Sequence, residues 1–138
     1  LKKRARRANV QNIQGVVIEE ALPLPDKFNG TADRVLVDAP CSGWGVVRRS
    51  PDIKWKPDSH NPARLPDLQV SLLHRHAPLL KDGGTLVYGV CTFRHEETVA
   101  VVERFLKEAP GFEKIAGGYF GPGPMDGFFM TAFRKIKS

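Results

Sequence analysis

The chain has 138 residues, of which 41% are hydrophobic and 26% are charged, a composition typical of one globular domain. Two cysteines do not make a disulfide framework, and no apolar run approaches the ~18 residues that cross a membrane, so we expect a reducing, cytoplasmic setting. The net charge of +6 favours a polyanionic partner such as nucleic acid.

The N-terminal segment is strongly basic. Leu1 is followed by five lysines and arginines within residues 2–7, and residues 2–9 predict the end of a basic helix. Its charge suits either a solvated surface or contact with RNA. Because the chain begins partway along this predicted helix, we expect it to be part of a longer protein. Residues 16–18 are β-branched and predict a strand, and residues 22–30 predict a loop.

The central part of the chain predicts a buried strand, a long loop and a helix. In the predicted strand at residues 34–37, all side chains after Arg34 are apolar. Apolar and polar residues do not alternate there, which is typical of strands buried on both faces. The proline-rich residues 38–66 are long and irregular, and such segments inside a domain are usually functional. Helical spacing then follows, and glycines at residues 83 and 84 predict the end of that helix. Its apolar positions are Leu68, Leu72, Leu73, Ala77 and Leu80.

The C-terminal part predicts three further strands and one helix. Residues 85–90 form the third predicted strand, and Thr92 is a candidate cap for the helix that follows. Residues 112–115 and 128–134 predict the last two strands. The order predicts an α/β fold with an open, mostly parallel sheet, helices on its faces and a terminal antiparallel strand added by a hairpin.

Two cysteines follow two neighbouring strands of this predicted sheet. Asp38 and Cys41 come directly after residues 34–37, and Cys91 comes directly after residues 85–90. Open α/β sheets bind ligands beyond the carboxyl ends of their strands, and neighbouring strands lie about 4.8 Å apart. We therefore expect Cys41 and Cys91 to face each other across one crevice, with Asp38 beside them.

Other roles for these cysteines remain open at this point. Each could be a small buried hydrophobic residue, or the two could form a disulfide. A structural zinc site is disfavoured, because the sequence has no CxxC motif and no histidine at ligand spacing from either cysteine. A thiolate could instead add to C6 of a pyrimidine, so that C5 accepts a methyl group. Asp38 would then lie near N3 of the pyrimidine ring and stabilise the adduct, and the second thiol could assist release of the product.

The amino-acid sequence around these residues is similar to that of a known family. The matching residues are Asp33 to Gly43, Arg48, Pro51, Trp55, Gln69, Leu72, Leu73, residues 79–88, Cys91, Glu96, Glu97 and residues 126–129. In this order they resemble the Sun-type RNA cytosine-5 methyltransferases over nearly the whole chain. The resemblance implies the C-terminal portion of a Rossmann-like class I methyltransferase sheet.

The resemblance also implies an activity and its residues. The family transfers a methyl group from S-adenosylmethionine to cytosine C5 in RNA through a covalent cysteine adduct. It implies that Cys91 is the nucleophile, that Cys41 assists product release, and that Asp38 lies between the methyl donor and the base. DNA cytosine methylases use the Pro-Cys cysteine instead, which would exchange the two roles, but the second cysteine favours the RNA assignment. The implied partner is rRNA or tRNA with an unstacked target base. We expect no membrane partner, and the sequence does not give the oligomeric state.

The sequence departs from the family pattern at the methyl-donor site. Val90 and Thr92 flank Cys91, where the family usually has Thr and Ser. Glu19, or else Glu20, stands where an aspartate usually contacts the adenine of the donor. The family's glycine-rich donor loop and ribose-binding acid have no match, so we expect them upstream together with the first strands. We therefore expect this piece alone to bind S-adenosylmethionine poorly.

The loop after Cys41 is the predicted RNA contact. Arg48, Arg49, Lys54 and Trp55 mix basic and aromatic side chains, which can hold phosphate and stack on a base. Trp55 could instead pack the loop onto the domain. Two other functions remain open: a non-catalytic RNA-binding piece of the same fold, and a thiol redox module that uses Cys41 and Cys91.

Overall fold

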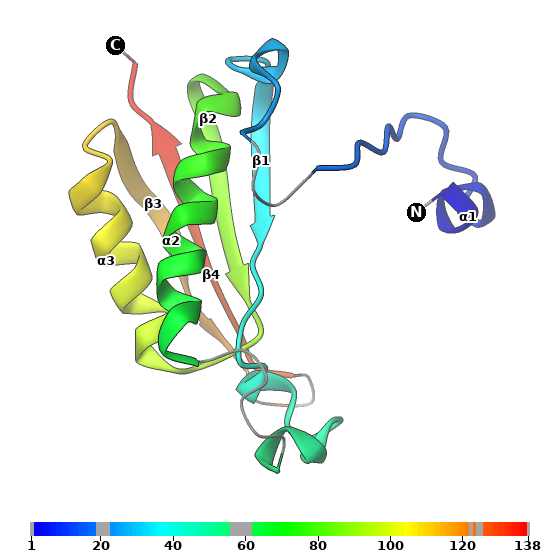
Figure 1. Ribbon diagram of the computed structural model, residues 1–138, viewed down its shortest axis with the longest axis vertical. Helices are drawn as coiled ribbons and strands as arrows, with labels where there is room; N and C mark the ends of the chain where they lie inside the picture. The colour runs from blue at the N-terminus through cyan, green and yellow to red at the C-terminus, as the bar shows by residue number, and fades with distance from the viewer. Residues whose placement is uncertain (1, 19–22, 56–61, 122, 124–125, 138) are drawn as a thin grey trace.

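The computed structural model describes residues 2–18, 23–55, 62–121, 123 and 126–137 (Figure 1). Its longer elements are α1 (Lys2–Arg7), β1 (Ala32–Asp38), α2 (Leu65–His76), β2 (Leu80–Val90), α3 (Val99–Glu108), β3 (Phe112–Phe120) and β4 (Phe128–Lys135). Short 3-10 turns occupy much of the segment between β1 and α2. None of the described helices is long and apolar enough to cross a membrane.

The four described strands form one mixed sheet in the order β1-β2-β4-β3. β1 and β2 are parallel, and β4 is antiparallel to both β2 and β3. Three strands therefore point one way and the C-terminal strand points the other way, as predicted. The terminal strand is not at the sheet edge, however, because β4 inserts between β2 and β3. One of the three pairings is parallel as a result, so "mostly parallel" describes the strand directions and not the hydrogen-bonded pairs.

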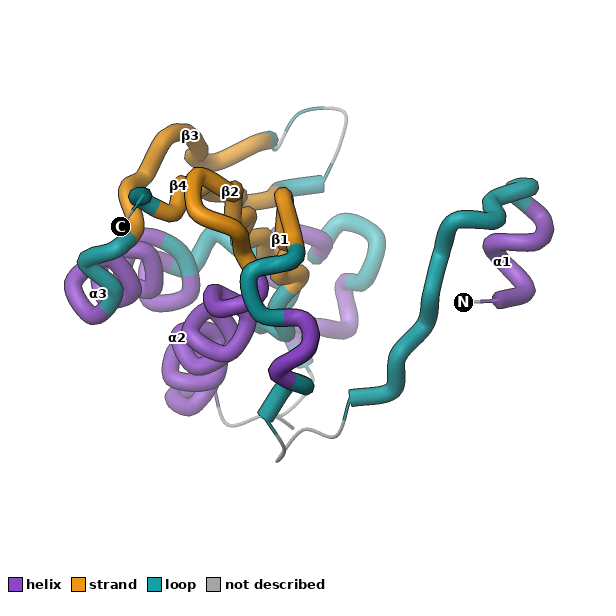
Figure 2. Tube along the Cα trace, turned by 90° about the horizontal axis from the view of Figure 1, so that it is seen from above, coloured by secondary structure: helices purple, strands orange, loops and turns teal. Residues whose placement is uncertain are grey.

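Helices α2 and α3 lie side by side on one face of the sheet, as Figures 1 and 2 both show. Phe105 of α3 is fully buried between them and the sheet, with its ring 5.1 Å from that of Phe133 and 5.2 Å from that of His74. The other sheet face is open among the described residues, where Leu36 is 68% exposed. The prediction that residues 34–37 are buried on both faces is therefore wrong for this chain.

Two other predicted elements also differ from the structure. Residues 16–18 form no strand and are exposed, Val17 by 95%. The second helix ends at His76, because Pro78 has no N–H to continue the helical hydrogen bonds. The glycines predicted to end it lie inside β2 instead, where Gly83 takes a left-handed φ of 78°. The pairing of β1 with β2 is irregular at the same place.

Candidate active site

The two cysteines meet at the carboxyl ends of β1 and β2. These strands are in parallel register up to Asp38 and Gly89, and the N–H of Ala39 still donates to the carbonyl of Gly89 at 3.1 Å. The next residues therefore leave the sheet together. Cys41 Sγ and Cys91 Sγ lie 3.3 Å apart, and both thiols are free and partly buried. The predicted juxtaposition of the cysteines is confirmed.

The contact between the two sulfur atoms makes the thiols unequal. With Cys41 as the hydrogen-bond donor, the pKa of Cys91 falls from 9.0 to about 7, although burial and the charges of Asp38 and Glu97 oppose this change. The same contact, together with burial, raises the pKa of Cys41 well above its ordinary range. The pair therefore favours a thiolate on Cys91, the predicted nucleophile, and a protonated thiol on Cys41.

Asp38 lies at the same strand end, with an exposed side chain. Its charge reaches Cys91 and raises the pKa of that thiol. Within the described part of the chain its carboxylate has no side-chain hydrogen bond, so it is available to a ligand. Glu19, the predicted contact for the donor adenine, falls outside the described residues.

The backbone at Gly45 joins three segments around the cysteines. Its N–H donates to the carbonyl of Cys91 at 2.9 Å, and its carbonyl accepts from the N–H of Gly127 at 2.8 Å. A Cβ at this position would lie 2.8 Å from the Cys91 oxygen and closer still to the Gly127 oxygen. A glycine is therefore required where these backbones cross. Sequence reasoning missed this role, because a single glycine in a loop carries no signal of what approaches it.

A group of polar side chains holds the loop around Cys41. The carboxylate of Glu97, whose side chain is 2% exposed, accepts from the N–H of Ser42 at 2.9 Å and from Nε2 of Gln69 at 3.1 Å. Gln69 Nε2 also donates to the carbonyl of Pro40 at 2.9 Å. In the sequence, Gln69 and Glu97 are residues that match the family pattern, and the sequence assigns them no role. Their meeting is a tertiary fact, because they are 28 residues apart.

Thr92 links the two cysteine segments directly. Its hydroxyl lies 3.0 Å from that of Ser42 and is fully buried. The prediction that Thr92 caps the following helix is wrong, since α3 begins at Val99 after a 3-10 turn, His95–Glu97.

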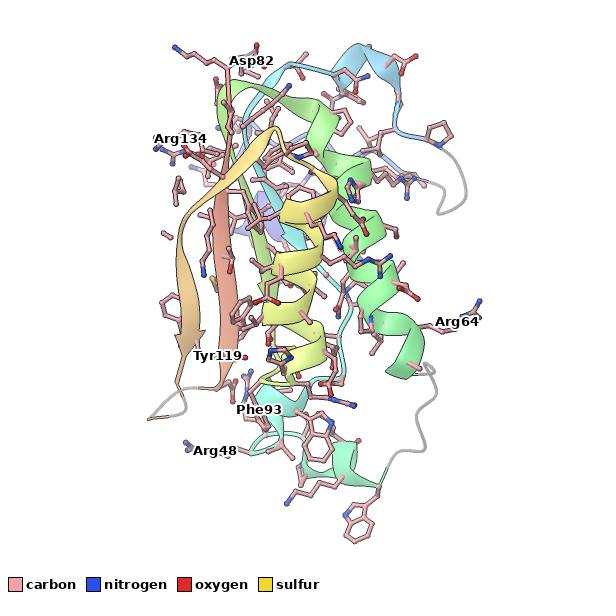
Figure 3. The ribbon with its side chains drawn as sticks, turned by 90° about the vertical axis from the view of Figure 1, so that its left-hand side faces the viewer. Arg48, Arg64, Asp82, Phe93, Tyr119 and Arg134 are labelled. Atoms are coloured by element: carbon pink, nitrogen blue, oxygen red, sulfur yellow. The ribbon has the colours of Figure 1, made fainter. Side chains whose placement is uncertain are left out.

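The predicted RNA residues do not form one uniform patch. Arg48 donates to the carbonyl of Gly123 at 2.7 Å, and Arg49 forms an ion pair with Asp126, so both reach the segment between β3 and β4. Lys54 is exposed at the end of a 3-10 turn, and Trp55 beside it is 81% exposed. The interpretation that Trp55 packs the loop onto the domain is therefore wrong within the described residues. Figure 3 shows Arg48 and Phe93 near the lower end of the molecule, where β1 and β2 finish.

The sequence of this chain is similar to those of ribosomal RNA methyltransferases. A family model described as 16S rRNA methyltransferase RsmB/F matches residues 1–134. The probable ribosomal RNA small subunit methyltransferase B of Bacillus subtilis (strain 168) is 41% identical over 129 residues, covering 78% of this chain and 28% of the relative. The ribosomal RNA small subunit methyltransferase B of Thermus thermophilus is 36% identical over 129 residues, covering 84% of this chain and 31% of the relative.

Solved structures show the same fold. The crystal structure of the protein PH0851 has a TM-score of 0.84 at 26% identity and covers 97% of this chain and 33% of that one. The crystal structure of NSun6 from Pyrococcus horikoshii with SFG has a TM-score of 0.78 at 24% identity and covers 99% of this chain and 38% of that one. The chain thus spans about a third of the length of the relatives it matches. Both the predicted family and the predicted class I methyltransferase fold are confirmed, and the chain belongs to the 16S rRNA methyltransferase RsmB/F family.

Proposed function

We propose that this chain carries the cysteine-bearing part of an RNA cytosine-5 methyltransferase that acts on ribosomal RNA. The observation that carries the proposal is the 3.3 Å contact between Cys41 Sγ and Cys91 Sγ, with the pKa of Cys91 lowered to about 7. A thiolate available at neutral pH is the nucleophile that addition to a pyrimidine requires. The names of the curated relatives favour ribosomal RNA over transfer RNA as the substrate.

The proposed reaction begins with the Cys91 thiolate. Its sulfur bonds to C6 of cytosine, the C5–C6 π electrons move to C5, and N3, beside Asp38, takes a proton from solvent. Once C5 has accepted the methyl group, Cys41 gives its own proton to solvent and takes the proton from C5. The C5–H electrons re-form the C5–C6 double bond, N3 gives up its proton, and the sulfur of Cys91 leaves as a thiolate. Attack and release then belong to different thiols. The lowered pKa of Cys91 supports its role in attack, and the contact that raises the pKa of Cys41 ends once the sulfur of Cys91 is bonded to C6.

S-adenosylmethionine is the methyl donor that the proposal assigns, and it supplies an electrophilic methyl group when bound. The described residues fit one edge of such a site. Asp38 offers an exposed carboxylate beside the thiols, without a side-chain hydrogen bond in the described part of the chain. We propose that the glycine-rich donor loop and the first strands belong to the part of the family's length that this chain does not span, so calorimetry should find no micromolar binding of the donor to this chain alone.

A covalent trap tests the proposed function. RNA that contains 5-azacytosine cannot complete release, because the ring has no proton at position 5, so an enzyme of this kind stays bonded to it. The complete protein should form an adduct that survives denaturing electrophoresis, and Cys91→Ala should abolish it while Cys41→Ala retains it. An adduct that persists in Cys91→Ala would overturn the assignment of the nucleophile. A protein that binds the RNA without any adduct would instead be the non-catalytic alternative.

The distance between the thiols also favours a second candidate, a reversible redox pair. A peroxide could take two electrons from the thiols, so that Cys41 Sγ and Cys91 Sγ bond, two protons leave and the peroxide becomes water. Counting free thiols under mild peroxide would test it. Loss of both thiols at low peroxide, with full recovery by a dithiol, would favour this candidate.

A further inference from the structure

We infer that Glu97, assisted by Gln69, is a positioning residue for the loop that carries Cys41, and that it serves release of the product more than attack by Cys91. The inference rests on the proposed function, because release is a step of that reaction. It begins from two hydrogen bonds, one on either side of Cys41, and a third that joins the two side chains that make them. The carbonyl of Pro40 accepts from Gln69, the N–H of Ser42 donates to Glu97, and Gln69 donates to Glu97 as well.

These contacts fix the backbone on both sides of the release thiol. Pro40 is held at its carbonyl at 2.9 Å and Ser42 at its N–H at 2.9 Å, so the peptide units around Cys41 cannot turn independently. Neither Gln69 nor Glu97 hydrogen-bonds to the backbone of Cys91 in the described residues, and the carbonyl of Cys91 accepts from the N–H of Gly45. The Gln69 and Glu97 pair therefore acts on one cysteine loop and not equally on both.

Glu97 is itself held firmly in place. Its own carbonyl accepts from the hydroxyl of Tyr88 at 2.7 Å, inside the sheet core, and its backbone N–H donates to the carbonyl of Arg94 at 3.0 Å. Thr98, the next residue, is fully buried and lies 2.7 Å from the hydroxyl of Tyr119. The carboxylate thus extends from a rigid turn, which is the arrangement needed to hold a loop.

The buried carboxylate of Glu97 is energetically unfavourable at this position. Its Oε1 has no hydrogen-bond partner among the described residues, and the Nε of Arg94 is 3.9 Å away on a partly exposed side chain. Burial of an ion without full pairing destabilises a fold in general. An apolar side chain would pack here without that penalty, but it would leave the N–H of Ser42 unpaired. The position therefore fits a requirement for placing the Cys41 loop.

The charge of Glu97 acts against attack by Cys91. It opposes a thiolate on Cys91 and raises the pKa of that thiol. Removal of the charge lowers the pKa of Cys91, whereas displacement of Cys41 raises it, so attack by Cys91 should change less than release does. A general collapse of the site would instead slow both attack and release. The two steps can be measured apart, which distinguishes a positioning role from a merely structural one.

The test measures formation and breakdown of the RNA adduct in the complete protein. With ordinary cytosine RNA and methyl donor, Glu97→Ala should release product about tenfold to hundredfold more slowly, as expected for a misplaced catalytic group. The rate of adduct formation on 5-azacytosine RNA should fall much less than the release rate does. Glu97→Gln keeps an oxygen that can accept from Ser42, and it should restore most of the release rate.

Further variants make the outcome decisive. Glu96→Ala is the matched control, because its side chain is 65% exposed and has no contact with the Cys41 loop, and it should behave as the parent. Gln69→Leu keeps the volume but removes both donated bonds, so it should also slow release, and it replaces Glu97→Ala if that variant does not fold. Parent-like release by both, or equal loss of attack and release, would overturn the inference. An adduct in Cys91→Ala would instead overturn the proposed function.

Discussion

At the scale of single residues, the site depends on one proton shared by two sulfur atoms. Cys41 and Cys91 are 50 residues apart and meet at 3.3 Å. Their positions after two apolar strands were enough to predict that they face each other. The inequality of the two thiols could not be predicted, because it depends on the contact distance, on the burial of each sulfur and on the charges of Asp38 and Glu97.

The pH dependence of thiol alkylation tests this inequality. Alkylation by iodoacetamide requires the thiolate, so the rate at Cys91 should rise with pH through a midpoint of about 7. The pKa of Cys91 is lowered by the Cys41 donor, so Cys41→Ala should move the midpoint upward. Mass spectrometry of the labelled peptide measures both profiles. Equal midpoints in the parent and in Cys41→Ala would contradict the proton-sharing contact.

A glycine substitution tests the crossing of backbones at the site. In Gly45→Ala the new Cβ would be 2.8 Å from the carbonyl oxygen of Cys91, so the loops must move apart. We expect this overpacking to lower the free energy of unfolding by about 1–3 kcal/mol. Gly118→Ala is the matched control, because a Cβ there meets nothing within 4 Å. Urea unfolding measures both, and equal stability of the two variants would contradict this account.

At the scale of elements, the place of β4 decides the core. Phe129, Thr131 and Phe133 of this strand are buried against the helices, whereas Met130 points to the open face and is 41% exposed. The sequence predicts a strand at residues 128–134, and β4 confirms it. Its insertion between β2 and β3 could not be predicted, because several pairings would bury the same side chains equally well.

A pair of truncations on β4 tests this arrangement. Phe133→Ala removes a fully buried ring that contacts Phe105 edge-on, with ring centres 5.1 Å apart. We expect a loss of about 3–5 kcal/mol in the free energy of unfolding, from lost burial and from the cavity. Met130→Ala, three residues earlier on the opposite face, should cost about 1 kcal/mol or less. Similar losses for both variants would contradict the assigned faces of the strand.

At the scale of the whole molecule, the described chain is one helix-covered sheet with its site at one end. The net charge of +6 suits an RNA partner, but it does not say where RNA lies. Arg48 and Arg49 already contact Gly123 and Asp126, so their loss would also free the segment between β3 and β4. Lys54 and Trp55 are exposed and are the cleaner probes of RNA contact.

RNA binding by the complete protein tests the proposed contact surface. Lys54→Ala should weaken binding and reduce the slope of log affinity against log salt by about 1, as for a lost phosphate contact. Trp55→Ala should weaken binding by about 1–3 kcal/mol with little change in that slope, as for lost stacking on a base. Lys107→Ala, on the exposed side of α3, is the control and should bind as the parent. Filter binding over a range of salt concentrations separates these cases.

The sequence by itself determined the fold class, the family and the pair of strand ends that bear Cys41 and Cys91. Apolar periodicity and the order of elements carry the fold class and the strand ends, and the matching residues from Asp33 to Gly43 together with Cys91 carry the resemblance to the family. These are local properties of the chain. Only the tertiary structure decided that β4 lies inside the sheet, that Leu36 is exposed, and that Glu97 and Gln69 hold the Cys41 loop. These features depend on contacts between residues far apart in the chain, and the residue types and their spacing are compatible with other arrangements.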